Sequence, residues 1–353
     1  MRTRFRTRET STDFPSRPSV APIERRRSFS PRIPQPLEVA SGLLGAAAVL
    51  LVVFAINMLL SRGSPTATVT PTVTPTPRAV QPVSVPSSSF PSGLASHACV
   101  RYGPLHGNQH HIVFIDPGHG GADAGATGST TNGKHVYEKN VTLSVALAAL
   151  PMLRGNGYTV VLSRDSDTLV TRTTAQDFSH GALTATGEQK DAQGRVACAN
   201  TAQAQALVLI HLNAYADPTM NGAETVYDST RPFRQSSQRL ATLIQQHVLS
   251  QFRSAGWPVP DRGVADDRAT GALAPTAGAA AFEHLLEIGP SGTGWLQHPS
   301  TMPGALAEPL FITHPEETDV AIDPKGVHAM AAGLSDAIDA YFSGGAAEAT
   351  TTP

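Results

Sequence analysis

Two histidines and a glutamate stand at positions from which they could bind one metal ion. His119 lies in the stretch HIVFIDPGHGGADAGATG, where an apolar run ends at Asp116 and five glycines follow. A glycine-rich loop leaves an imidazole uncrowded, so the ring can approach a cation closely. His211 ends a second apolar run, ALVLIHL, and Glu138 opens the next expected helix. Two histidines and one carboxylate, with a fourth position open, are the usual ligands of a catalytic zinc in hydrolases.

Each of these residues also has a simpler interpretation when it is taken alone. His119 could be a loop histidine that hydrogen bonds to the backbone, and His211 could be a buried strand-end residue. Glu138 is a favourable helix-start residue, because a carboxylate is stabilised near the positive end of the helix dipole. The sequence contains no HExxH, GxSxG or P-loop motif that would decide the matter.

The elements that must position these residues alternate between strands and helices. We expect strands and helices from the apolar periodicity and from the glycine and proline breaks. The expected strands are 112–116, 158–164, 206–212, 222–227, 284–289 and 305–311, and the expected helices are 138–154, a helix through Arg195 to about 204, 233–255 and 326–342. This alternation predicts an α/β fold with a mainly parallel central sheet flanked by helices on both faces. Working groups of such sheets gather at the carboxyl ends of the strands.

The N-terminal part differs sharply in composition from the rest. Residues 1–36 carry nine arginines and three acidic residues, so their net charge is about +6 and that of the remainder is about −8. The acidic remainder argues against a nucleic-acid-binding body. Residues 37–62 contain an apolar run of about 20 residues, long enough to span a bilayer. The arginines before it place the N-terminus in the cytoplasm and the rest of the chain outside. A cleaved signal peptide and a buried helix are the alternatives.

A stalk and one folded domain follow this expected transmembrane anchor. Residues 63–95 are rich in Pro, Thr and Ser, which favours an extended chain of roughly 100 Å. The catalytic domain is expected over 96–343, between this stalk and a flexible tail at 344–353. The protein is therefore expected at the cell membrane, with a basic, disordered cytoplasmic tail at 1–36 and its folded domain facing the cell exterior.

Several motifs together resemble a known family. FIDPGHGGADAGATG, YEKNVTLSVALAALPMLRGNGYTVVLSR and RVACANTAQAQALVLIHLNA occur in this order, followed by GAETVY, DRGVA and MPGALAEPLFITHPEE. Over about residues 111–342 the chain resembles the zinc-dependent N-acetylmuramoyl-L-alanine amidases of bacterial cell walls. The resemblance implies that His119, Glu138 and His211 bind Zn²⁺ and that a late glutamate is the catalytic base. It also implies peptidoglycan as substrate, cleaved between N-acetylmuramic acid and L-alanine of the stem peptide.

Two glutamates compete for the role of the catalytic base. Glu308 in ALAEPLFITHPEE is favoured, because Phe311 and the Pro-Glu-Glu that follows keep the register of the family. Glu287 in HLLEIG is the alternative, since Ile-Gly follows it as in many relatives. The chain departs from the family at Pro309-Leu310, which replaces the usual Gly-Phe, and the segments 166–187 and 289–304 are longer than usual.

Other polar residues have open interpretations. Asp116 and Asp123 brace the glycine loop or orient a ligand histidine. Arg262 contacts substrate or forms an ion pair. For Asn213 and Glu224, orienting groups around His211 and a structural role at the sheet edge are equally plausible, and Arg195 and Asn200 are expected to be structural. Cys99 and Cys198 could form a disulfide in an oxidising exterior.

Two other functions remain compatible with the sequence. The chain could be a catalytically silent relative that binds the cell wall or recruits an active partner. It could also be a zinc peptidase that cuts within the stem peptide.

Overall fold

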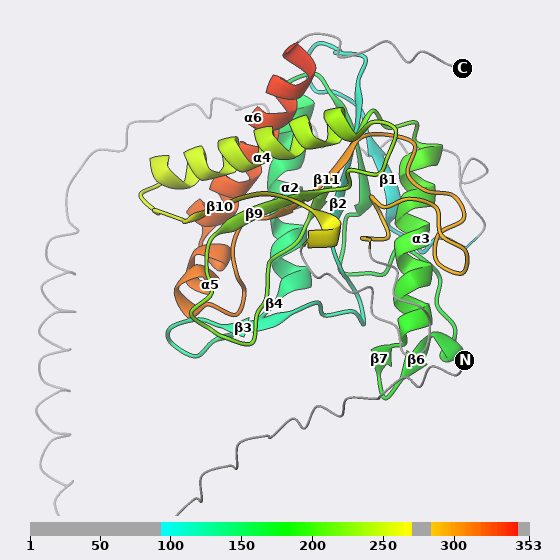
Figure 1. The fold of residues 1–353 in the computed structure, drawn as a ribbon, viewed down its shortest axis with the longest axis horizontal. Coiled ribbons are helices and arrows are strands. Elements are labelled where there is room, and N and C mark those ends of the chain that lie inside the picture. The colour runs from blue at the N-terminus through cyan, green and yellow to red at the C-terminus, as the bar shows by residue number, and fades with distance from the viewer. Residues whose placement is uncertain (1–92, 270–283, 345–353) are drawn as a thin grey trace, which may run out of the picture. The chain divides into compact units, whose positions relative to one another are not determined.

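The computed structural model describes residues 93–269 and 284–344 (Figure 1). The expected cytoplasmic tail (1–36), the expected anchor (37–62), nearly all of the stalk (63–95) and the end of the chain lie outside these residues. Within the two described ranges, no helix combines the length and the apolar character needed to cross a membrane.

Seven strands form the central sheet. Their order is β1 (Ala98–Tyr102), β5 (Thr159–Arg164), β2 (Ile112–Pro117), β8 (Ala206–Ile210), β11 (Gly304–Glu308), β9 (Ala223–Tyr227) and β10 (Asp261–Asp266). The four strands β5, β2, β8 and β11 are parallel, whereas β1 pairs antiparallel with β5, and β9 pairs antiparallel with β11. The sheet is therefore mixed, with a parallel centre whose carboxyl ends lie along one edge.

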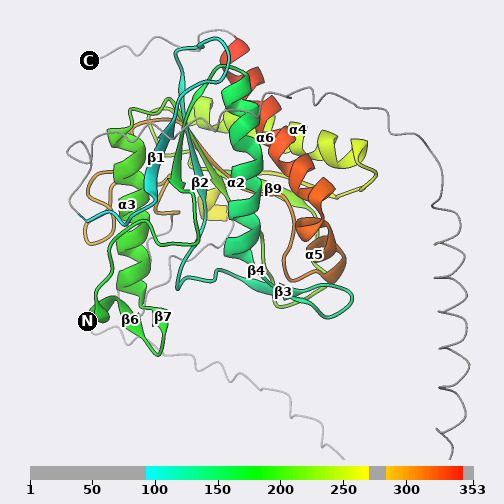
Figure 2. The same ribbon diagram turned by 180° about the vertical axis from the view of Figure 1, so that it is seen from behind.

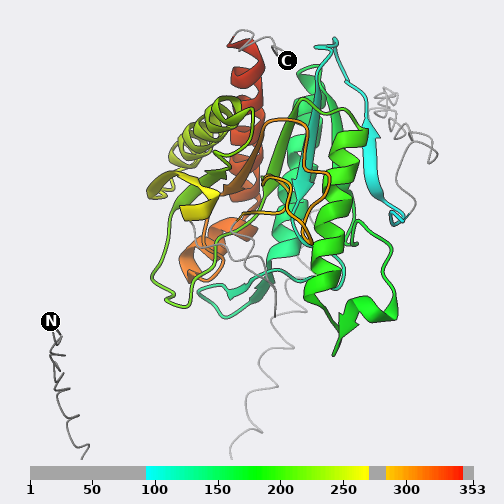
Figure 3. The same cartoon turned by 45° about the vertical axis from the view of Figure 1, so that its right-hand side comes forward.

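Helices cover both faces of this sheet, as the sequence predicts. Figures 2 and 3 show α2 (Glu138–Gly155), α4 (Arg234–Ser254) and α6 (Pro324–Ser343) on one face and α3 (Ala185–Thr201) on the other. Alternate residues of β2 serve the two sides, because Val113 and Ile115 join the core under the three helices and Phe114 joins the core beside α3. Burying one such side chain contributes about 1.5–3 kcal/mol.

Short elements complete the described part of the chain. β3 (Thr127–Ser129) pairs with β4 (His135–Tyr137) just before α2. The polar insert 166–187 holds a short 3-10 helix (Ala175–Asp177), the strand pair β6 (Phe178–Ser179) and β7 (Ala182–Leu183), and the start of α3. A second 3-10 helix (Asp267–Ala269) follows β10, and α5 (Pro315–Ile322) precedes α6.

The prediction of a strand at 284–289 is wrong. HLLEIG forms turns, and Leu286 and Ile288 are buried against α3 and the sheet. A short apolar run that ends at Gly289 and Pro290 is compatible with any buried segment, so its periodicity does not identify a strand. The strand that precedes β11 along the chain is β10, whose sequence DRGVAD carries too little apolar character to be recognised as one.

A disulfide joins Cys99 of β1 to Cys198 of α3. Both cysteines are buried among the apolar residues between the sheet and α3. The bond fixes the edge strand β1 to the helix that covers its face, and it answers the question that the sequence left open.

Candidate metal centre

His119, Glu138 and His211 converge at the carboxyl edge of the parallel strands. His119 follows β2, His211 follows β8, and Glu138 is the first residue of α2. One ligand atom from each lies within 4.8 Å of the others. The three side chains come from distant parts of the sequence, and the ends of β2 and β8 and the start of α2 bring them together.

Two glycines make room for these side chains. A Cβ at Gly118 would lie 2.3 Å from the ring of His211, and a Cβ at Gly125 would lie 2.6 Å from the ring of His119 and 2.8 Å from Glu138 Oε2. His119 itself adopts a left-handed backbone conformation, with φ of 63°. Such a conformation is uncommon for a non-glycine residue and is found at functional sites, where the surrounding contacts enforce it.

The carboxylate of Glu138 lies between the two histidines. Its Oε2 lies 3.1 Å from Nε2 of His119, and its Oε1 lies 3.1 Å from Nδ1 of His211. The N–H groups of Ala126 and Leu212 donate to Oε2 and Oε1, at 2.8 and 2.9 Å. The carboxylate is almost fully buried, and these two backbone hydrogen bonds fix its orientation.

The loop of His119 is fastened by three charged side chains. Asp123 Oδ2 lies 2.8 Å from Nδ1 of His119 and so fixes the ring. Arg195 donates to Asp116 Oδ1 at 2.6 Å and to the carbonyl oxygen of His119 at 2.7 Å. Asp123 thus orients the histidine directly, whereas Asp116 acts on the loop through Arg195. Asn200 has a structural role, since it bonds to the carbonyl of Pro299 and to Thr301.

The charges of this cluster favour a bound cation. Burial works to lower the pKa of His119, but the carboxylates of Glu138 and Asp123 outweigh burial and raise it to about 10. Burial likewise works to raise the pKa of Glu138, yet the two histidines hold it well below its usual range. The site therefore stabilises a positive charge. In the free protein a proton on His119 supplies this charge, and a divalent ion could supply it instead. The imidazole and carboxylate donors and the space left by Gly118 and Gly125 fit zinc.

Glu308 lies at the same edge, at the end of β11. Ala307 is opposite Ile210 in the parallel pair, so Glu308 and His211 are the next residues on neighbouring strands. Asn213 Nδ2 donates to Glu308 Oε2 at 2.7 Å. Burial, reinforced by the carboxylates of Glu138 and Glu224, raises the pKa of Glu308 to about 8 against the opposing charge of Arg262. A carboxyl group with this pKa can accept and release a proton near neutral pH.

Glu287 approaches the site from another side. It lines a pocket of about 480 Å³ together with His119 and His211, and Glu308 is not part of that lining. Burial, followed by the charge of Asp116, raises the pKa of Glu287. The structure thus places both candidate bases near the histidines, Glu308 beside His211 in the sheet and Glu287 across the pocket.

The sequence reasoning missed several residues of this pocket. The remaining lining includes Glu188 and Asp191 of α3 and the turn residues His284, Leu285 and Leu286. A signal existed for Asp191, because it stands four residues before Arg195 and pairs with it at 2.9 Å. No comparable pattern marks the turn residues.

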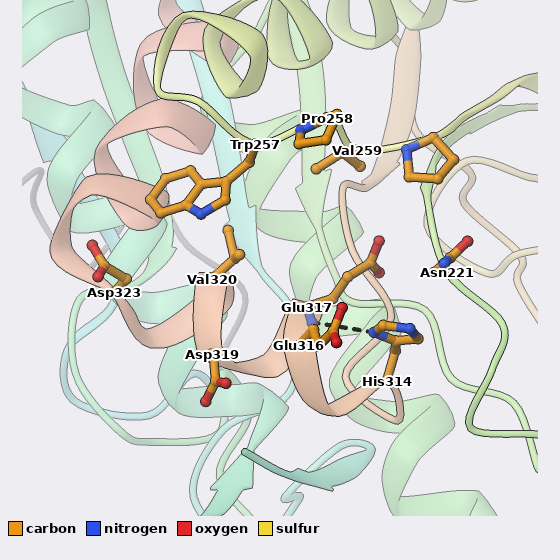
Figure 4. A pocket seen from close by; sticks show the side chains of 11 residues that line it. Asn221, Trp257, Pro258, Val259, His314, Glu316, Glu317, Asp319, Val320 and Asp323 are labelled. Carbon is orange, nitrogen blue, oxygen red and sulfur yellow. Dashed lines mark hydrogen bonds between the residues drawn. The ribbon is translucent and has the colours of Figure 1, made fainter. Parts of the chain in front are cut away.

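A second pocket of about 400 Å³ lies beside α5, and none of the three expected ligands lines it (Figure 4). Trp257, Val259 and Val320 give it an apolar part, and Glu316 stands at its exposed side. Glu317, which points into it in Figure 4, accepts hydrogen bonds from the N–H groups of Gly222 and Phe311. Glu317 therefore ties the start of β9 to the loop after β11. The guanidinium of Arg262 lies 5.1 Å above the Phe311 ring, and its charge acts to lower the pKa of Glu308. Among the residues described, Arg262 forms no ion pair within 4 Å.

Comparison with known proteins supports one family. A family model described as N-acetylmuramoyl-L-alanine amidase matches residues 113–340. The germination-specific N-acetylmuramoyl-L-alanine amidase of Bacillus subtilis (strain 168) is 28% identical over 240 residues, which cover 68% of this chain and 82% of that protein. The N-acetylmuramoyl-L-alanine amidase LytC of the same organism is 36% identical over 152 residues, which cover 43% of this chain and 24% of that protein.

A solved structure has a similar fold. The CwlD amidase from Clostridioides difficile, solved in complex with the GerS lipoprotein, is 21% identical with a TM-score of 0.50. The match covers 67% of this chain and 100% of that one. It supports the fold alone, a central sheet with helices on both faces.

Proposed function

The chain belongs to the N-acetylmuramoyl-L-alanine amidase family, and we propose that it uses a zinc ion held by His119, Glu138 and His211 for the hydrolysis. It is a peptidoglycan hydrolase that cleaves the amide between N-acetylmuramic acid and L-alanine of the stem peptide. The observation that carries the zinc proposal is the convergence of three donor atoms within 4.8 Å from three separate elements.

The division of roles follows from the contacts. When bound, zinc supplies Lewis acidity, which polarises a carbonyl group and makes water more acidic. His119 and His211 would hold the ion through neutral imidazoles. The hydrogen bonds that the backbone N–H groups of Ala126 and Leu212 donate to Glu138 would keep the Glu138 carboxylate directed at the ion. Asp123 would orient His119 through its second ring nitrogen, as carboxylates do beside many ligand histidines.

Glu308 is the proposed acid and base. Its carboxylate would take the proton of the attacking water and deliver it to the amine that leaves, which is the amino group of L-alanine. Asn213 holds one oxygen of Glu308, so the other oxygen remains for the proton transfer. The pKa of about 8 leaves both protonation states accessible near neutral pH.

The test uses the purified full chain on purified peptidoglycan. We expect zinc-dependent release of stem peptides with a free L-alanine amino group, which mass spectrometry of the products identifies. His119→Ala should lose the zinc ion held by His119, Glu138 and His211 and abolish release, and Glu308→Gln should keep that zinc ion but lose release. Products cut inside the stem peptide would instead identify a peptidase, and a zinc-free, inactive wild type would identify a silent relative.

We also propose that residues 37–62 anchor the protein in the cell membrane, with the catalytic domain facing the wall. The long apolar run and the arginines before it support this proposal. Fractionation of cells that express the full chain tests it: the full chain should remain with the membrane in high salt, and a chain that lacks residues 1–62 should not. Release of the full chain by salt would contradict the anchor.

A further inference from the structure

A second group of potential ligands lies at the opposite edge of the sheet. β9 and β10 are parallel to each other and antiparallel to β11, so their carboxyl ends point away from Glu308. Tyr227 is opposite Asp266 in this pair, which brings the following residues, Asp228 and Asp267, side by side. His284, which also lines the first pocket, approaches both from the turn segment.

The three side chains present their donor atoms to a common point. One atom each of Asp228, Asp267 and His284 lies within 4.8 Å of the others. Nδ1 of His284 is 2.8 Å from Asp228 Oδ2 and 3.3 Å from Asp267 Oδ2. Asp228 and Asp267 are each 1% exposed, so both carboxylates have lost nearly all of their hydration.

Hydrogen bonds hold the carboxylate of Asp228 in one orientation. The backbone N–H and the hydroxyl of Thr230 both donate to Oδ1 of Asp228, at 2.6 and 2.5 Å. Oδ2 of the same carboxylate is buried and accepts no hydrogen bond, although Nδ1 of His284 is near it. Metal sites have this arrangement, in which outer contacts fix one oxygen and leave the other for the ion.

Asp267 is held in a similar way by the segment that carries His284. The backbone N–H of Leu285 donates to Oδ2 of Asp267 at 3.0 Å. The nearby carboxylate of Asp266 is paired with Arg268 at 2.8 Å, and the guanidinium of Arg231 donates to the carbonyl oxygens of Gly289 and Ser300. Two buried carboxylates this close together favour a positive charge beside them, and His284 lies where it can supply that charge as a protonated ring or hold a metal ion there.

We propose that Asp228, Asp267 and His284 form a second, structural binding site for a divalent transition metal such as Zn²⁺. Two carboxylate oxygens and an imidazole nitrogen are donors that suit zinc better than calcium, which prefers oxygen alone. The ion would join the ends of β9 and β10 to the start of the segment whose residues Leu285, Leu286 and Glu287 line the first pocket. The alternative is a proton on His284 that balances the two carboxylates without metal.

Zinc stoichiometry of the full chain tests the proposal. The protein is saturated with Zn²⁺, freed of unbound metal by gel filtration, and analysed by inductively coupled plasma mass spectrometry. We expect two zinc ions per chain in the wild type and one in His119→Ala. We expect one in Asp228→Asn, which keeps the acceptor for Thr230, and none in the double variant. His298→Gln, an exposed histidine of the same segment, is the matched control and should keep two.

A measurement on His119→Ala guards against misfolded variants. In that background, added Zn²⁺ should raise the midpoint of thermal unfolding, and Asp228→Asn should remove this response. A His119→Ala protein that binds no zinc overturns the second site, whatever the other variants do. A failure of the first site has a different signature, since wild type and His119→Ala would then each bind one zinc and Asp228→Asn none.

Discussion

Three long helices, α2, α4 and α6, cover one face of the sheet, whereas α3 shares the opposite face with the irregular segment 284–303. The helical face belongs to one continuous core with regular spacing of its apolar residues. The other face has smaller apolar clusters, including Trp295 and Leu296 against α3. The three proposed ligands of the first site lie within two residues of a strand end or at a helix start, while the irregular segment supplies His284, Leu285, Leu286 and Glu287 to the pocket wall.

We infer from this difference that the two regions have different roles in the active site. Regular strands and helices hold groups to within a few tenths of an ångström, which bond-making chemistry requires. An irregular segment tolerates changes of length and sequence and therefore suits the shaping of a pocket. If this division holds, removing a polar group from a strand end should cost far more activity than removing one from the irregular segment.

The largest expected effect compares the two candidate bases. Glu308→Gln should lower kcat by about 10³-fold, because the amide cannot take up the proton, and removal of a general acid or base costs about 10²–10⁴-fold. Glu287→Gln should lower kcat by less than about tenfold, and its effect should be mainly on KM. Steady-state kinetics on purified peptidoglycan give both numbers, with zinc content measured in parallel. A larger loss in Glu287→Gln than in Glu308→Gln would reverse the assignment of the base.

The regular face and the meeting of His119, Glu138 and His211 were predictable from sequence because their signals are local. Apolar periodicity marks α2, β2 and β8, and the glycine loop marks His119. The parallel order of strands then implies that groups at their ends meet. Glu308 required a further step, since two glutamates in apolar surroundings compete for the role in the sequence.

The irregular face was not predictable in the same way. HLLEIG carries a strand-like composition, yet β11 is already paired on both sides, with β8 and β9, so no position beside it is left for another strand. β10 was missed for the opposite reason, because its residues DRGVAD are half exposed and charged. Asp228, Asp267 and His284 have no spacing signal, since only the pairing of β9 with β10 brings the two aspartates together.

The disulfide should contribute the next largest effect. Cys99 and Cys198 are 99 residues apart, and a cross-link over such a loop contributes about 3 kcal/mol or more to the free energy of unfolding. Replacing both cysteines by Ala should therefore lower the unfolding free energy by about 3 kcal/mol, measured by urea denaturation. Wild-type protein under reducing conditions is the control and should show a similar loss. A change below about 1 kcal/mol would mean that the packing of α3 on the sheet suffices without the bond.

A smaller effect is expected at the aspartate that holds His119. Asp123→Asn should weaken zinc binding by about 10–100-fold, because loss of a carboxylate beside a ligand histidine typically has this cost. Asp167→Asn is the matched control, since Asp167 contacts the same loop at the Gly121 N–H and Lys139 but touches no ligand. Competition with a chelator of known affinity measures both. Equal losses in the two variants would show that loop rigidity, rather than orientation of His119, is what matters.

The smallest expected effect concerns the pH dependence of stability without metal. The pKa of Glu308 is raised from 4.5 to about 8 in the folded protein, chiefly by burial. The folded state therefore keeps a proton that the unfolded state loses between these pH values, so this group lowers stability as pH rises from about 4.5 to 8. Glu308→Gln removes the cost and should be more stable than wild type by about 1 kcal/mol at pH 8.5, a value reduced from the full shift because the side chain is partly exposed. The stabilities of the two proteins should converge near pH 4.

Denaturant unfolding in EDTA across this pH range measures the difference. Glu287→Gln should also be more stable than wild type at high pH, because burial also raises the pKa of that carboxyl. If wild type and Glu308→Gln lose stability in parallel as pH rises, Glu308 is already ionised in the folded wild type over this range. The strand end would then carry a negative charge and would differ from the irregular segment in charge as well as in regularity.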